Sequence, residues 1–193
     1  MKNKKLIIII LLILITIVII WLYFMRDGGV NLLVEERNNP ASRLIHPGDP
    51  NVKLFDFKMF ANASSTEAVS NDYFIKLFKF SIDDASTFSD WNVKNVRLID
   101  ESGQELGRIN SLHNKLFPVE FAVSAPANNS FQLLADIDNT PITSSSTLQV
   151  NLAYMEVENI MSHEDEPVYL NTANFPLLTP QSVLNGVEFF ITP

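Results

Sequence analysis

The sequence predicts an all-β head domain, an antiparallel Greek-key β-sandwich of about seven to nine strands, preceded by one N-terminal transmembrane α-helix. Two observations lead to this prediction. Residues 6–25 form a continuous uncharged, apolar run. After that run, short apolar or alternating stretches are separated by turn-forming residues, and no long amphipathic helical pattern appears.

The first expected element is a transmembrane helix over residues 6–25. Twenty helical residues reach about 30 Å, the thickness of the hydrocarbon core of a bilayer. A buried helix of a soluble domain would show a polar face, and this run shows none. We interpret the run as a signal-anchor, with Leu6 and Leu14 in the lipid bilayer and Trp21 and Tyr23 at the far interface.

Two other interpretations of this run stay open. A cleaved signal peptide has a shorter apolar region that ends in small residues, whereas the small pair Gly28-Gly29 follows Arg26 and Asp27 here. A pilin-like helix would pack with its copies in a surface filament. Type IV pilins carry a glycine processing site before the run and a glutamate near its start, and this run has neither.

Charge predicts the orientation of the anchor and the domain boundaries. Three lysines precede the run, and a lone Arg26 beside Asp27 follows it, so the N-terminus is expected in the cytoplasm. The expected divisions are a basic tail over residues 1–5, the anchor over 6–25, a linker over 26–29 and an extracytoplasmic, cell-surface β-sandwich over 30–193.

Composition narrows the functional classes. The 193 residues include 14 Lys and Arg against 22 Asp and Glu, a net charge of −8, which argues against nucleic acid as a partner. There is no cysteine, which excludes thiol catalysis, cysteine-ligated zinc and disulfides. The expected partners are the lipid bilayer, through residues 6–25, and other envelope proteins or copies of the chain.

The strands of the head are expected between turn signals. The apolar stretches are Val30–Glu36, Ser42–His46, Val52–Ala63, Tyr73–Ile82, Asn92–Asp100, Gln104–Ile109, Leu116–Ala125, Ser130–Ile137, Ser146–Ile160, a short edge strand within His163–Leu170, and Asn185–Thr192. Turns at Glu101–Gly103 and at Pro126–Asn129 predict two hairpins. In the stretch from Ser146, strict alternation places Leu152 and Tyr154 on one face.

Three stretches are similar, in order, to Ig-like β-sandwich repeat domains of bacterial cell-envelope and surface proteins. They are NNPASRLIHPGDPNVKLFDFKM, NVKNVRLIDESGQELGRI and FPVEFAVSAPANNSFQLLADIDNTPITSSSTLQVNL. The resemblance spans Asn38 to about Leu152 and implies an Ig-like surface domain with a structural or binding role. It supplies no catalytic residues. This chain departs from the pattern by having one copy behind an apolar segment, with an added tail from Ala153 to Pro193.

The residues give no pattern of an enzyme or of a bound cofactor. No nucleophile motif is present, and His46, His113 and His163 lie in separate turns or loops without a second ligand nearby. We therefore expect no catalytic residue and no resident metal. Calcium is the one cation for which the sequence offers candidate ligands: Asp136, Asp138 and Asn139, at a strand end.

The last expected strand contains the candidate interaction residues. Phe189 and Phe190 are adjacent, so the two side chains must point to opposite faces of a strand, and one of them can face a partner. Together these observations predict a non-enzymatic, membrane-anchored surface module with a structural or protein-binding role. The alternative is a pilin-like filament subunit that polymerises through its N-terminal helix.

Overall fold

The computed structural model describes residues 32–37, 42–61, 72–84, 92–112, 116–125, 127–141, 145–172, 176–179, 181–186 and 188–192. The predicted anchor, with Leu6, Leu14, Trp21 and Tyr23, lies outside these residues. The described part contains eleven strands: β1 (Leu32–Glu36), β2 (Ser42–Ile45), β3 (Val52–Ala61), β4 (Asp72–Asp84), β5 (Val93–Asp100), β6 (Glu105–Ser111), β7 (Leu116–Ser124), β8 (Ala127–Ile137), β9 (Ser146–Asn159), β10 (Val168–Leu170) and β11 (Glu188–Ile191).

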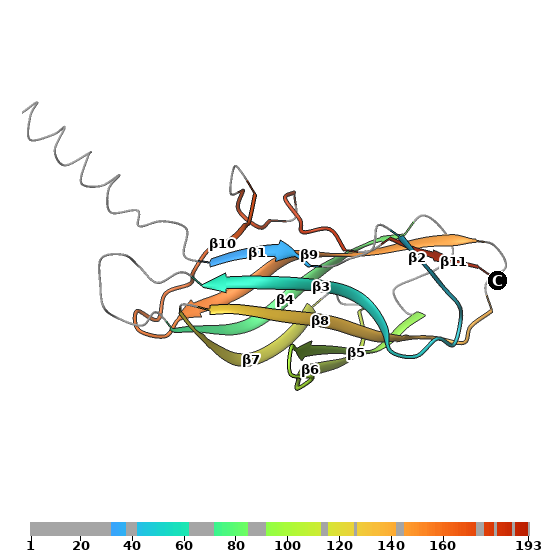
Figure 1. Cartoon of the computed structure of the whole chain (residues 1–193), viewed down its shortest axis with the longest axis horizontal. Helices are drawn as coiled ribbons and strands as arrows, with labels where there is room; N and C mark the ends of the chain where they lie inside the picture. The colour runs from blue at the N-terminus through green and yellow to red at the C-terminus, as the bar shows by residue number, and fades with distance from the viewer. Residues whose placement is uncertain are drawn as a thin grey trace, which may run out of the picture.

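The strands form two sheets that face each other, as the all-β prediction requires (Figure 1). One sheet has the order β10-β1-β3-β8-β5-β6 and the other the order β2-β11-β9-β4-β7. The expectation of purely antiparallel sheets is wrong in two places. The short strands β10 and β2 pair in parallel with β1 and β11. Both are edge strands, and each pairs with a strand that is distant in the sequence, so no tight hairpin forces an antiparallel approach.

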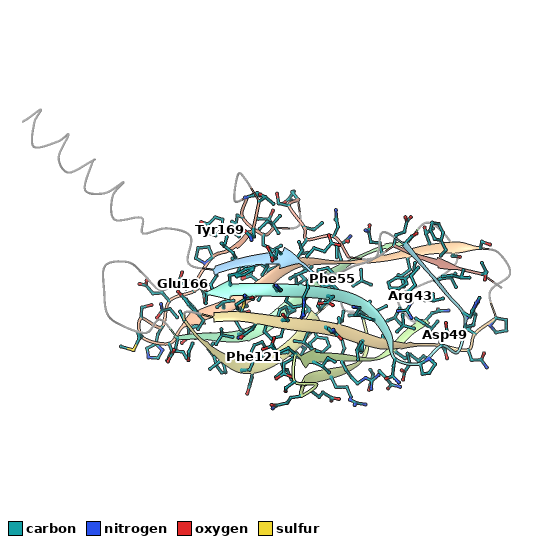
Figure 2. The ribbon with its side chains drawn as sticks, viewed as in Figure 1. Arg43, Asp49, Phe55, Phe121, Glu166 and Tyr169 are labelled. Carbon is teal, nitrogen blue, oxygen red and sulfur yellow. The ribbon has the colours of Figure 1, made fainter. Side chains whose placement is uncertain are left out.

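Aromatic side chains fill the space between the sheets. Phe55 and Phe57 of β3 stack at a centroid distance of 5.3 Å, and Phe57 also meets Phe78 of β4 across the core at 5.7 Å. Phe131 of β8 lies 5.3 Å from Phe57. Figure 2 shows Phe55 in this interior. Such offset and edge-on pairs add to the stabilisation from burying their apolar area, so these phenylalanines help to hold the two sheets together.

The predicted hairpin between β5 and β6 is confirmed. The two strands pair antiparallel around a turn in which Gly103 has a φ of +83° and donates its N–H to the Asp100 carbonyl. One Asp100 carboxylate oxygen accepts from the backbone N–H groups of Ser102 and Gln104, at 2.9 and 2.8 Å. The Ser102 hydroxyl donates to the same oxygen at 2.7 Å, and this hydrogen bond is the largest cause of a lowered pKa at Asp100. The backbone hydrogen bonds lower that pKa further.

The second predicted hairpin is wrong. β7 pairs with β4 in one sheet, whereas β8 pairs with β3 and β5 in the other, so the chain changes sheets between β7 and β8. Asn128 and Asn129, expected in a turn, extend β8 and pair with Phe60 and Met59. Local turn signals cannot distinguish a reversal within one sheet from a crossing to the other, because both use the same residues.

The two ends of the sandwich are defined by strand register. Leu32 pairs with Ala61 and with Val168, so these residues lie together where the described chain begins; we call this the entry end. At the other end, the Gly48 N–H donates to the Ile137 carbonyl, and His46 lies beside Thr192; we call this the far end. Figure 1 shows β1 and β10 toward one end of the long axis and β2 and β11 toward the other.

Candidate interaction surfaces

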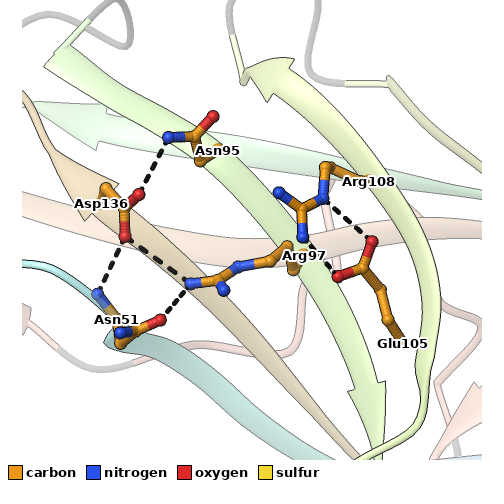
Figure 3. Close-up of polar contacts among 6 residues, drawn as sticks. All are labelled: Asn51, Asn95, Arg97, Glu105, Arg108 and Asp136. Carbon is orange, nitrogen blue, oxygen red and sulfur yellow. Dashed lines mark hydrogen bonds and ion pairs between the residues drawn. The ribbon is translucent and has the colours of Figure 1, made fainter.

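The calcium candidate Asp136 lies at the far end in a network of nitrogen donors. Its carboxylate accepts from the Asn51 backbone N–H and from the Asn95 side-chain amide, both at 2.9 Å, and its Oδ1 lies 3.6 Å from the Arg97 guanidinium (Figure 3). The Asn51 hydrogen bond is the largest cause of a lowered pKa at Asp136, followed by the Asn95 hydrogen bond. The network joins the start of β3 to β5 and β8.

Asp138, the second candidate, is also engaged. It accepts from the Lys94 ammonium at 2.7 Å, from the Thr140 hydroxyl at 2.9 Å and from the Asn139 backbone N–H at 3.0 Å. The described residues contain no group of three or more histidine, aspartate or glutamate side chains arranged to hold a metal. Calcium at Asp136, Asp138 and Asn139 stays a prediction, and the ion would have to displace the nitrogen donors now bound there.

The histidines are dispersed. His46 lies at the far end with its Nδ1 3.3 Å from the Thr192 hydroxyl, and the exposed His163 lies 2.9 Å from a Glu158 carboxylate oxygen. His113 lies outside the described residues. The structure therefore does not bring His46 and His163 together.

The predicted interaction pair splits between the two faces of β11. Phe189 is completely buried in the core, so it is not available to a partner, whereas Phe190 is 44% exposed. Phe190 pairs in register with Leu44 of β2, which is 54% exposed. Because β2 is the edge of its sheet, these two side chains form an apolar pair at the far end that we call the edge pair.

A second exposed surface is a groove along the side of the sandwich, between β9 and β10. Its volume is about 440 Å³. The groove is lined by Tyr154, Met155, Val157, Asp165, Glu166, Pro167, Val168, Leu177, Leu178 and Thr179. Val168 and Leu178 are buried in its floor, and Tyr154 and Leu177 are 41% and 43% exposed at its wall.

Sequence reasoning missed this groove because it placed Tyr154 on the wrong face. Strict alternation puts Tyr154 with the buried Leu152, but the register between β4 and β9 shifts at this point: Lys79 pairs with Tyr154 and the next residue, Phe80, pairs with Leu152. The extra residue, Ala153, forms a bulge and is buried. A bulge reverses the inward and outward order beyond it, so Tyr154 is turned outward.

In the part of the chain that the structure describes, no helix has the length and apolarity needed to cross a membrane. The predicted anchor residues Leu6, Leu14, Trp21 and Tyr23 belong to the portion outside it.

Comparison with known proteins gives no family. No protein-family model matches the chain. No curated protein sequence matches it either. Among solved structures, a family 123 glycoside hydrolase from Clostridium perfringens is similar at 9% identity and a TM-score of 0.41, over 84% of this chain but only 27% of that chain. The N-terminal domain of PorA matches at 11% identity and a TM-score of 0.34, over 83% of this chain and 97% of that domain.

A cohesin module from a Clostridium perfringens family 33 glycoside hydrolase covers 85% of this chain and 100% of its own length, at 6% identity and a TM-score of 0.33. These values are too low to carry an argument about function.

Proposed function

We propose that this chain is a non-enzymatic cell-surface module that binds another envelope protein through the far end of its β-sandwich, and that residues 6–25 tether it to a membrane. One observation carries the binding role: the edge pair, Leu44 and Phe190, exposes two large apolar side chains in register on neighbouring strands at a sheet edge. Single exposed apolar residues are common, but apolar contacts at an open strand edge favour association.

The position of the edge pair supports this role. Six residues separate the proposed anchor from Leu32, so the entry end lies within about 25 Å of the anchor, even with this linker fully extended. The edge pair is on β2 and β11, toward the opposite end of the long axis (Figure 1). A tethered head would therefore present it away from the membrane. The net charge of −8 disfavours contact between copies, so we assign the partner to a different protein.

The test is site-specific photo-crosslinking with the full-length chain on its own cells. A photoreactive phenylalanine analogue at position 190, which is exposed and already aromatic, should give a discrete adduct with a second protein. The matched control is the same analogue at Met161, which is 66% exposed and follows β9 near the entry end, and it should give no such adduct. Adding Leu44→Ser should reduce the adduct formed from position 190.

Three outcomes would overturn the proposal. The first is the absence of any adduct from position 190, and the second is the same set of adducts from positions 190 and 161. The third is an adduct of twice the mass of the chain, which would assign the edge pair to self-association. Protease treatment of intact cells tests the tether separately, since the proposed orientation exposes the head and protects the N-terminus.

A further inference from the structure

The groove between β9 and β10 is large enough for several side chains. Its volume, about 440 Å³, falls within the range of ordinary ligand pockets, about 300–1,000 Å³. Its floor is apolar, formed by Met155, Val157, Val168 and Leu178. The exposed rings and chains of Tyr154 and Leu177 extend this apolar surface outward. An occupant would therefore bury aliphatic groups here.

The backbone beside the groove has a gap in its pairing. On this side of β9, Leu152 forms a two-way bridge with Leu184, and the next backbone bond runs from the Glu166 N–H to the Val157 carbonyl. Among the described residues, no strand pairs with β9 on this side between those two points. A peptide in extended conformation fits such a gap, because it can both fill the floor and approach a strand edge.

The rim of the groove is acidic. Asp165 and Glu166 line it, and no ion pair joins either of them to a lysine or arginine of the described residues. Lys76, a basic residue near this rim, forms its ion pair with Glu158. The pKa of Tyr154 is raised, first by burial and then by the charges of Glu156 and Asp165.

We propose that this groove binds an extended segment of another protein that carries aliphatic side chains together with lysine or arginine. The apolar floor takes the aliphatic side chains, and Asp165 and Glu166 attract the cationic groups. The same acidic rim repels nucleic acid, anionic lipid and a second copy of this chain, whose net charge is −8. This surface is separate from the edge pair, so the inference does not depend on the proposed function.

The test is fluorescence anisotropy with a labelled probe peptide and the full-length chain in zwitterionic-lipid nanodiscs. The probe is a hexapeptide of alternating leucine and lysine; the two comparison peptides replace every lysine by glutamate or every leucine by serine. Only the leucine–lysine peptide should bind appreciably. Its binding should weaken when NaCl rises from about 50 mM to about 500 mM, since salt screens exposed charges. Empty nanodiscs measure the background from lipid.

Variants locate the binding. D165N together with E166Q should weaken the probe about 3- to 10-fold, the loss expected for two exposed charge pairs. L177S should weaken it at least as much. E36Q together with E188Q makes the same change in net charge at exposed carboxylates on β1 and β11, and should leave affinity within about twofold. Thermal unfolding of each variant checks that the head stays folded. All the substituted positions except Glu166 are exposed, so we expect little effect on folding.

Equal affinity for the D165N/E166Q variant and its E36Q/E188Q control would overturn the inference, because binding would then depend only on net charge. Equal binding of the glutamate or serine peptide would also overturn it. The edge-pair variant L44S/F190S should bind the probe normally. Photo-crosslinking from position 190 tests the edge pair in a separate experiment, so failure here and failure of the proposed function are distinguishable.

Discussion

Among the glycines that the structure describes, Gly186 has the least room for an added methyl group. A Cβ at this position would lie 2.0 Å from the Val150 carbonyl oxygen and 2.8 Å from the Phe55 ring. The backbone also passes close to β9 because the Gly186 N–H donates to the Asn151 side chain at 3.0 Å, and its carbonyl accepts from Gln149 at 2.8 Å. Glycine is needed here for close approach of two backbones.

We expect Gly186→Ala to lower the free energy of unfolding by about 3 kcal/mol or more, because the methyl group must displace the backbone. The control is Gly103→Ala. Gly103 has a φ of +83° and no atom within 4 Å of an added Cβ, so the left-handed conformation alone costs about 1–2 kcal/mol. Chemical denaturation of both variants measures the difference. An equal loss in the two would contradict the close approach at Gly186.

At the scale of elements, the network around Asp136 stabilises the far end by joining β3, β5 and β8. The lowered pKa of Asp136 means that its charged carboxylate is more stable in the folded state than in the unfolded chain. This contribution to stability is present above the unfolded pKa, about 3.9, and is lost as the pH falls through the lower folded pKa. Asp138 and Glu158, whose pKa values are also lowered, act in the same direction.

We therefore expect the free energy of unfolding to fall as the pH is lowered from about 5 to about 2. Asp136→Asn should destabilise the head at neutral pH, since Arg97 loses its charged partner. It should also make the free energy of unfolding fall less steeply as the pH is lowered. Denaturation curves across this pH range measure both effects. Glu36→Gln, an exposed change on β1, is the control that should keep the wild-type slope. An unchanged slope in Asp136→Asn would contradict the role of this carboxylate.

At the scale of the whole molecule, the two functional models differ in the fate of residues 6–25. A membrane tether predicts that the full-length chain fractionates with membranes and is released by detergent as small particles. A filament core predicts ordered fibres in the material sheared from cells. Fractionation of cells followed by electron microscopy of both fractions distinguishes them. Fibres in the sheared fraction would contradict the tether and favour the pilin-like alternative.

Most elements of this protein could be predicted from local pattern. The alternation in Val52–Ala61, the Asp100–Gly103 turn and the opposite faces of Phe189 and Phe190 each depend on a few neighbouring residues. Such signals identify strands, some turns and the all-β class, because backbone geometry fixes which side chains share a face. The apolar run over residues 6–25 likewise predicts a tether from hydrophobicity and length alone.

Only the tertiary structure decided where the strands go and which surfaces they leave exposed. Three features depend on partners far away in the chain: the change of sheet between β7 and β8, the parallel placement of β2 and β10, and the bulge at Ala153. A bulge of one residue turned Tyr154 outward and formed the wall of the groove. The sequence determined which apolar and acidic side chains are available for the two candidate surfaces. Strand register determined where those side chains lie, because register is set by long-range contacts that no local pattern contains.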